Sequence, residues 1–295
     1  MAGLGCLVRQ RPRGGTGMSA FAAQWLDLRE PADRRARNAD LLATVARHFS
    51  DHAQIAVTDL GCGTGAMMRT LAPRLPARQS WRLVDQDTGL LDAVEQRCRE
   101  MPPAMAWQPH QADLQEDLEA VMALPADLVT ISALLDLTSI AWLERLAEAA
   151  ATHQRPVYAT LTYNGRIACE PADPFDAQVA CAFDAHQRRD KGFGHASGPL
   201  ASTQAIEQLA ARRFIVRQAD ADWVLDDSER ALQAELVQGW YQAACEEDVL
   251  DRQKLDGWLA RRLAAVRAGR TRLTVGHCDI WAYPPAPRSR SSSRS

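Results

Sequence analysis

Three glycines at alternate positions follow a short apolar run near residue 60. The segment reads Thr58-Asp59-Leu60-Gly61-Cys62-Gly63-Thr64-Gly65-Ala66, after the apolar stretch Ile55–Leu60. Glycine adopts the backbone angles of a tight turn and lets a ligand approach the main chain. The pattern predicts a buried strand, a turn and a helix whose first N–H groups face a ligand. A second predicted strand ends at Asp85, where nucleotide-binding parallel sheets carry a carboxylate for ribose hydroxyls. We therefore expect a nucleoside-containing ligand.

Two cofactors satisfy the spacing of this glycine loop, residues 61–65. A dinucleotide site has Gly-x-Gly-x-x-Gly or Ala, and Gly61, Gly63 and Ala66 fit that looser pattern. An S-adenosylmethionine site has an acid followed by Gly at the second, fourth and sixth positions after it. Asp59, Gly61, Gly63 and Gly65 match this pattern at every position.

From Asp59 to Tyr163 the chain resembles the class I S-adenosylmethionine-dependent methyltransferases. Four segments carry the resemblance in the family's order: 57–65 (VTDLGCGTG), 83–87 (LVDQD), 111–114 (QADL) and 127–132 (DLVTIS). The resemblance implies a doubly wound, mostly parallel, seven-stranded α/β sheet of the Rossmann-like kind. It also implies S-adenosylmethionine as the cofactor.

The resemblance implies a place for each part of the cofactor. The glycine loop would lie under the methionine part, with Asp59 as an orienting acid. Asp85 would receive the ribose hydroxyls, and Asp113 and Leu114 would flank the adenine. The segment from Ser132 to Leu135 would face the transferred methyl group.

The N-terminal part of the chain supplies a candidate cover for this site. Residues 19–49 are predicted to be helical with a break near Pro31. Family members often cover the cofactor with N-terminal helices, and an arginine among Arg34, Arg35 and Arg37 could pair with the methionine carboxylate. The alternative for this segment is a solvated, charged helix.

The methyl acceptor should lie at the carboxyl ends of the fourth and fifth predicted strands, 128–134 and 156–163, where ligands of doubly wound sheets bind. The fourth strand runs into Ser132-Ala133-Leu134-Leu135-Asp136. It lacks both the Pro-Pro-aromatic signature of exocyclic-amine nucleic-acid methyltransferases and the Pro-Cys nucleophile of cytosine-C5 enzymes. The chain also has no basic stretch rich in aromatic residues. We therefore expect a small-molecule acceptor and no nucleic acid.

Methyl transfer to oxygen or nitrogen requires proximity and sometimes a base for the acceptor proton. Histidine titrates near neutral pH, so His186 and His195 are candidate bases. Asp136 is a candidate for orienting an acceptor amine or hydroxyl. The glycine-rich loop 191–199, which begins with Lys191, is typical of a lid. For each side chain the alternative is an ordinary helix-face or surface position.

Strand and helix patterns alternate along the chain, as in parallel α/β sheets. Two stretches, 164–201 and 226–270, match no part of the family pattern and are predicted as insertions on the acceptor side. The predicted strands are 55–60, 81–84, 105–109, 128–134, 156–163, 214–218 and 272–283. The predicted helices after residue 49 are 66–75, 88–99, 140–151, 176–189, 203–212, 227–246 and 251–268.

Composition sets the remaining expectations. The chain has 295 residues, a net charge of −3 and seven cysteines, which form no metal-ligand or disulfide pattern. No run is long and apolar enough to span a membrane, and no secretion signal is present, so we expect a cytoplasmic protein. Only Lys191 and Lys254 are lysines, which is typical of a high-GC bacterial gene. Residues 1–17 and 286–295 are predicted to be disordered around a domain at 18–285, with Met18 as an alternative start.

The sequence thus predicts an S-adenosylmethionine-dependent methyltransferase that acts on oxygen or nitrogen of a small molecule. One alternative is an NAD(P)-linked oxidoreductase, on the looser glycine pattern. Another is a non-catalytic module that binds S-adenosylmethionine. The sequence predicts no metal, and it does not indicate the acceptor or the oligomeric state.

Overall fold

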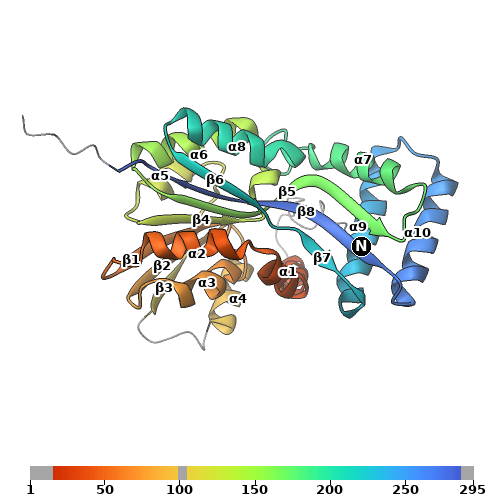
Figure 1. Ribbon diagram of the computed structural model, residues 1–295, viewed down its shortest axis with the longest axis horizontal. Coiled ribbons are helices and arrows are strands. Elements are labelled where there is room, and N and C mark those ends of the chain that lie inside the picture. The colour runs from red at the N-terminus through yellow and green to blue at the C-terminus, as the bar shows by residue number, and fades with distance from the viewer. Residues whose placement is uncertain (1–15, 99–104, 287–295) are drawn as a thin grey trace, which may run out of the picture.

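One mixed sheet runs through the whole molecule (Figure 1). The computed structural model describes residues 16–98 and 105–286. The strand order is β3-β2-β1-β4-β5-β8-β6, and β7 also pairs with β8. The first five strands are parallel, whereas β8 is antiparallel to its neighbours. The strands are β1 Ile55–Leu60, β2 Gln79–Asp85, β3 Met105–Gln111, β4 Leu128–Ser132, β5 Val157–Glu170, β6 Ile215–Asp220, β7 Trp223–Leu225 and β8 Arg272–Tyr283.

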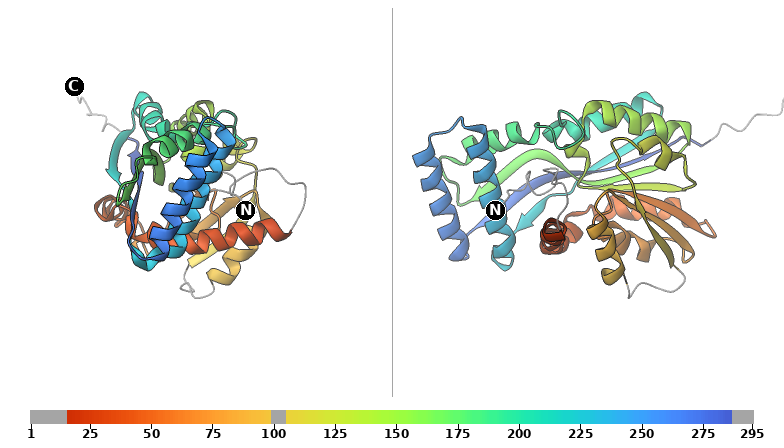
Figure 2. Two further views of the ribbon diagram at one scale, coloured as in Figure 1. Left: turned by 90° about the vertical axis from the view of Figure 1, so that its right-hand side faces the viewer. Right: turned by 180° about the vertical axis from the view of Figure 1, so that it is seen from behind.

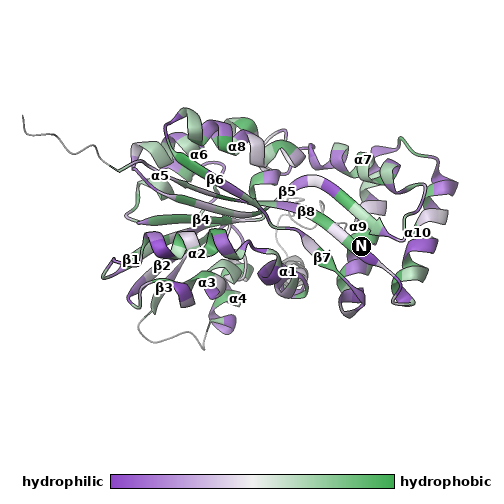
Figure 3. Ribbon diagram, in the orientation of Figure 1, coloured by the Kyte–Doolittle hydropathy of each residue, from purple (hydrophilic) through white to green (hydrophobic). Residues whose placement is uncertain are grey.

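Helices cover both faces of the parallel part of the sheet. One hydrophobic core joins the sheet to α2, α3 and α4, and a second joins it to α5, α6 and α8. Hydrophobic and hydrophilic residues alternate along α8 and α10, as expected of helices buried on one side (Figure 3). The helices are α1 Thr16–Ala36, α2 Ala39–His48, α3 Ala66–Leu71, α4 Thr88–Arg97, α5 Leu118–Ala123, α6 Ile140–Thr152, α7 Asp176–Gln187, α8 Ala201–Ala211, α9 Arg230–Glu247 and α10 Arg252–Arg267.

A second lobe is built on the far ends of β5 and β8. These strands continue as a long antiparallel ribbon with β7 beside it, and α7, α9 and α10 pack against the ribbon (Figure 2). A third hydrophobic core lies here, with Phe183, Trp223, Trp240 and Trp258 almost fully buried. Trp25 of α1 belongs to the same core, so α1 joins the two lobes.

A buried carboxylate fixes the register where the two lobes meet. Asp279 of β8 accepts hydrogen bonds from the backbone N–H of Leu161 and of Asn38, both at 2.9 Å. Leu161 has a φ of 56°, and the pairing of β5 with β8 shifts register beside it. A leucine in this left-handed conformation is strained, and such strain persists where the surrounding structure holds it.

The predicted α/β fold class is confirmed, with two corrections to its elements. The sheet has eight strands and not seven, because the three residues of β7 pair with β8. The N-terminal helix continues through Pro31 and ends at Ala36, and Asn38 then caps α2 by accepting from the N–H of Leu41.

The predicted boundaries of the domain and its insertions also shift. The first predicted insertion begins inside β5, which extends to Glu170. Helix α1 begins at Thr16, two residues inside the segment that was predicted to be disordered. Residues 1–15 and 287–295, which make up most of the two predicted disordered ends, lie outside the described residues.

Candidate functional site

The glycine loop has the backbone conformation that its sequence predicts. Gly61, Gly63 and Gly65 have φ values of 67°, 54° and 81°, and Gly65 stands immediately before α3. These left-handed conformations are open to glycine and disfavoured for other residues. The predicted sequence of buried strand, turn and helix is therefore confirmed, with the loop at the carboxyl end of β1.

Two buried ionisable side chains, one acidic and one basic, lie beside this loop, and each has one atom without a hydrogen-bond partner among the described residues. Asp59 is 1% exposed, and its Oδ1 accepts a hydrogen bond from Thr130 Oγ1 at 2.7 Å. Arg37, just after α1, is 4% exposed and donates to Thr70 Oγ1 at 3.4 Å and Ser132 Oγ at 3.1 Å. Asp59 Oδ2 and Arg37 Nε have no hydrogen-bond partner among the described residues.

These two atoms match the charged groups of an α-amino acid. Burial raises the pKa of Asp59 to about 7, although the hydrogen bond from Thr130 and the charge of Arg37 act against the rise. An ammonium would supply the donor that Asp59 Oδ2 lacks, and a carboxylate would supply the acceptor that Arg37 Nε lacks. The residues present therefore fit the methionine part of S-adenosylmethionine. Of the three arginines predicted as candidates, Arg37 is the one that is buried and has an unpartnered nitrogen among the described residues.

Asp85 has a structural task that the sequence did not reveal. The side chain is 6% exposed, and its Oδ2 accepts from the N–H of Gly63 at 3.0 Å. Its Oδ1 accepts from the N–H of Asp87, also at 3.0 Å. Asp87 in turn caps α4 by accepting from Gly89 and Leu90. Asp85 therefore ties the end of β2 to the glycine loop, and a carboxylate can accept more hydrogen bonds than these two.

The predicted adenine and methyl-side residues lie at the same edge of the sheet. Asp113 follows β3 and accepts from the N–H of Gln115 at 2.9 Å, which forms a turn. Leu114 is 2% exposed in the core, and its carbonyl accepts from Trp142 Nε1 at 2.7 Å. Ser132 ends β4 and binds Arg37 as described above. Their contacts with a cofactor stay predictions.

Helix α1 covers the glycine loop. A β-carbon on Gly63 would lie 3.0 Å from Leu26 Cδ1, so the leucine tip touches the loop. Glu30 accepts from Arg69 of α3 at 3.0 and 2.5 Å, and Asp27 accepts from Arg97 of α4 at 2.7 and 2.5 Å. Two acidic side chains of α1 thus form ion pairs with α3 and α4 beside the glycine loop. The helix lies between the two lobes (Figure 1).

Asp136 lies in the turn after β4, on the side of the second lobe. It is 7% exposed, and its Oδ1 has no hydrogen-bond partner among the described residues. Burial raises the pKa of Asp136 to about 6, while the backbone N–H of Tyr163 and the charges of Arg29 and Lys191 act against the rise. The carboxylate can therefore accept a hydrogen bond or take a proton near neutral pH.

The predicted base His186 has both ring nitrogens engaged. Its Nε2 lies 2.9 Å from Glu246 Oε2 on α9, and its Nδ1 lies 3.3 Å from Lys191 Nζ. Because the carboxylate only accepts, Nε2 carries the hydrogen and Nδ1 accepts from the lysine. Burial lowers the pKa of His186. This arrangement favours a positioning task for His186, whereas His195 is exposed in the loop and its role as a base stays a prediction.

Several side chains of this region could not be assigned from sequence. Lys191 is 4% exposed although lysine is normally a surface residue, and its rarity in the chain was the one available signal. Arg29 donates to Asp33 at 2.9 Å, and its guanidinium lies 5.7 Å from the ring centre of Trp223. Glu246 carried no sequence signal, because it lies 60 positions from His186 in the chain.

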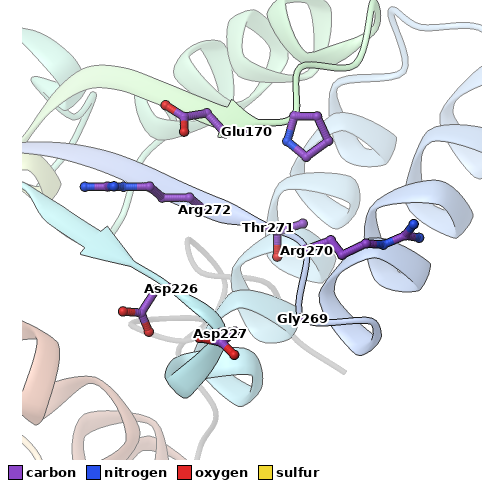
Figure 4. Close-up of a pocket in the computed structure, with 8 residues that line it drawn as sticks. Glu170, Asp226, Asp227, Gly269, Arg270, Thr271 and Arg272 are labelled. Atoms are coloured by element: carbon purple, nitrogen blue, oxygen red, sulfur yellow. The ribbon is translucent and has the colours of Figure 1, made fainter.

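A surface pocket at the far end of the second lobe does not qualify as this site (Figure 4). It carries charges of both signs, and Thr271 in its floor donates to Gln233. None of its lining side chains is a buried polar group without a partner. Its lining is Glu170, Pro171, Asp226, Asp227, Gly269, Arg270, Thr271 and Arg272.

The described residues contain no candidate for a metal site or for a membrane-spanning helix. No group of three or more His, Cys, Asp or Glu side chains there could hold a metal ion. In the same part of the chain, no helix is both long and apolar enough to cross a membrane.

One family model and several solved structures are similar to parts of this chain. Residues 57–157 match the family model of a methyltransferase domain. A sequence search among curated proteins found no match. Among similar solved structures, YcgJ from Bacillus subtilis has 12% identity and a TM-score of 0.48 over 85% of this chain and 100% of that chain.

Two other solved structures are similar to the same degree. The cyclopropane synthase MmaA2 from Mycobacterium tuberculosis has 12% identity and a TM-score of 0.44, over 81% of this chain and 83% of that chain. Phosphoethanolamine N-methyltransferase 2 from Haemonchus contortus has 12% identity and a TM-score of 0.46, over 92% of this chain and 61% of that chain. At these identities and scores the likeness gives no information on the acceptor.

Proposed function

We propose that this chain, whose residues 57–157 match the family model of a methyltransferase domain, is a class I S-adenosylmethionine-dependent methyltransferase that methylates a small molecule on oxygen or nitrogen. The observation that carries the proposal is the pair of unpartnered buried atoms, Asp59 Oδ2 and Arg37 Nε, beside the glycine loop. They supply one acceptor and one donor for the amino-acid part of the cofactor. Asp136 also has an oxygen without a hydrogen-bond partner among the described residues, and we assign it to the binding of the molecule that receives the methyl group.

Each residue has a defined task in this proposal. S-adenosylmethionine supplies a methyl group on a sulfonium, which is transferred by in-line displacement. Asp59 and Arg37 hold the ammonium and the carboxylate, and Asp85 holds the ribose. Asp136 orients the acceptor group and receives its proton. Buried groups of this kind act mainly by fixing the two reactants in an attacking geometry.

The burial of the side chains on the proposed methyl-acceptor side of the site supports a small molecule over a nucleic acid as the acceptor. Asp136, His186 and Lys191 are each less than 8% exposed, so a group that reaches them must enter the interior between the lobes. The net charge of −3 also gives no general attraction for phosphate backbones.

Labelled cofactor tests the function directly. The purified chain is incubated with methyl-labelled S-adenosylmethionine and a microbial small-molecule extract, and the product is identified by mass spectrometry. We expect label in a small molecule and binding of S-adenosylmethionine by calorimetry. Binding of NAD without binding of S-adenosylmethionine would favour the oxidoreductase. Binding of S-adenosylmethionine without turnover on any extract would favour the non-catalytic module.

The raised pKa of Asp59 predicts that cofactor binding depends on pH. Only the ionised carboxylate attracts an ammonium, and with a pKa of about 7 a tenth of the sites is ionised at one pH unit below that value. We expect the affinity to fall roughly tenfold per pH unit below pH 7, in a range where the cofactor's α-amino group stays protonated. Binding near pH 7 should also release a proton.

Calorimetry from pH 5.5 to 7.5, in buffers of different ionisation enthalpy, measures both effects. Asp59→Asn serves as the matched variant, because it keeps the shape and removes the titration. Its binding should be weaker and independent of pH. A wild-type affinity that stays constant over this range would contradict the assignment of Asp59.

A further inference from the structure

Three buried side-chain oxygens near the second lobe lack a hydrogen-bond partner among the described residues. They are Asp136 Oδ1, Gln187 Oε1 and Ser197 Oγ. Their residues are 7%, 6% and 7% exposed, so water reaches them poorly. Carboxylate and amide oxygens only accept hydrogen bonds, and a hydroxyl oxygen accepts as well as donates. A group that satisfies all three must therefore bring hydrogen-bond donors.

Backbone contacts hold the three residues in one region. The N–H of Ser197 donates to the carbonyl of Thr138 at 2.7 Å, two positions after Asp136. A β-carbon on Gly198 would lie 3.4 Å from the backbone carbonyl of Gln187. The turn after β4, the end of α7 and the loop that follows α7 thus pack directly against one another.

Two cations lie within electrostatic reach of the same carboxylate. The charges of Arg29 and Lys191 both stabilise the ionised form of Asp136. Lys191 is held by His186, whose Nδ1 lies 3.3 Å from Lys191 Nζ. His186 is held in turn by Glu246, whose Oε2 lies 2.9 Å from His186 Nε2. Positive charges in a buried region oppose a second cation there. The donors that satisfy the three oxygens should therefore belong to an uncharged group.

We propose that the acceptor presents an uncharged primary amino group to Asp136, Gln187 and Ser197 and is methylated on nitrogen. This inference rests on the proposed function and narrows it to one substrate class. A primary amine brings two N–H donors and keeps its lone pair for the methyl group. A hydroxyl brings one donor for three oxygens, and a carboxylate brings none.

The electrons, charge and proton of the methyl transfer are all accounted for by the amine, S-adenosylmethionine and Asp136. The nitrogen lone pair forms the new N–C bond while the C–S bond breaks, and its electron pair stays on sulfur as a neutral thioether. The nitrogen then carries one positive charge, and its proton passes to the carboxylate of Asp136. The charges of Lys191 and Arg29 keep the incoming amine in its uncharged, nucleophilic form.

Selective blocking of amines tests the substrate class without knowledge of the acceptor. One half of a microbial small-molecule extract is treated with an amine-selective acetylating reagent, and the other half is mock-treated. Both halves receive the full chain and methyl-labelled S-adenosylmethionine. We expect acetylation to reduce label incorporation at least tenfold and the labelled product to carry its methyl group on nitrogen.

Other outcomes separate this inference from the proposed function. Equal label in both halves, with the methyl group on oxygen, overturns the amine and leaves the methyltransferase in place. Absence of label in both halves, with S-adenosylmethionine still bound, overturns the methyltransferase and the amine together.

Two substitutions test the residues once the amine is identified. Ser197→Ala and Gln187→Leu should each raise the KM for the amine about fivefold or more, with the cofactor affinity unchanged. Tyr158→Phe is the matched control, because Tyr158 also carries a buried, unpartnered hydroxyl but lies in the core shared with α2 and α3. It should leave KM and kcat unchanged. Folded Ser197 and Gln187 variants with an unchanged KM would overturn the assignment.

Discussion

Gly63→Val should eliminate binding of S-adenosylmethionine while the chain stays folded. Gly63 has a φ of 54°, a conformation that β-branched residues avoid, and a β-carbon there would lie 3.0 Å from Leu26 Cδ1. The new side chain would therefore fill the space above the loop and push α1 away from it. The N–H of Gly63 also donates to Asp85 Oδ2, so a shift of the loop would also disturb Asp85, the carboxylate proposed to bind the ribose.

Calorimetry with S-adenosylmethionine and circular dichroism measure the two parts of this prediction. Backbone strain of this kind costs about 1–3 kcal/mol, which a folded domain normally tolerates. Gly269→Val is the control, because Gly269 also has a positive φ, 63°, but follows α10 in the second lobe. The control should be destabilised and still bind the cofactor. A folded Gly63→Val variant with wild-type affinity would refute the site.

The cofactor half of the fold was predictable because its signals are local. A buried strand, three glycines and a helix follow one another within residues 55–71, and parallel strands must bring their carboxyl ends together. The N-terminal helix was placed correctly, but Pro31 did not end it. Ala32 and Asp33 beside that proline are buried against the rest of the protein, and this packing outweighs the local preference of proline.

The second lobe and its polar contacts depend on partners far apart in sequence. Residues 164–170 (NGRIACE) lack a strand pattern, and they form part of β5 because β8 pairs with them. The hydrogen-bonded series Glu246–His186–Lys191 joins three segments, of which α9 is far from the other two in sequence. Sequence periodicity carries no information on such pairs, so a histidine that resembles a free base can be fixed by two neighbours.

Asp85→Ala should weaken S-adenosylmethionine by roughly 10- to 1000-fold. Hydrogen bonds to a charged group contribute about 1.5–3 kcal/mol each before they are coupled, and the ribose offers two hydroxyls. The structure adds a second reason, because Asp85 also holds the N–H of Gly63 at 3.0 Å. Asp85→Asn should weaken the binding of S-adenosylmethionine less than Asp85→Ala does, since the amide keeps one acceptor oxygen.

Asp87→Ala is the control for this prediction. Asp87 caps α4 through the N–H groups of Gly89 and Leu90, so its loss should lower the stability by about 1 kcal/mol. Its effect on cofactor affinity should stay within about threefold, well below a single hydrogen bond to a charged group. A large loss of affinity in Asp87→Ala with none in Asp85→Ala would show that the wrong carboxylate has been assigned to the ribose.

A cofactor analogue separates the two tasks of Asp85. S-adenosylhomocysteine and its 2′-deoxy form differ by one hydroxyl, and each is titrated into the wild-type chain and Asp85→Ala. If Asp85 binds the ribose, the wild-type chain should prefer the hydroxylated form by about tenfold or more, and the variant should lose this preference. If Asp85 acts only by holding Gly63, the variant should weaken both ligands equally and keep the preference. That second result would leave the carboxylate as a support of the glycine loop and assign the ribose hydroxyls to another partner.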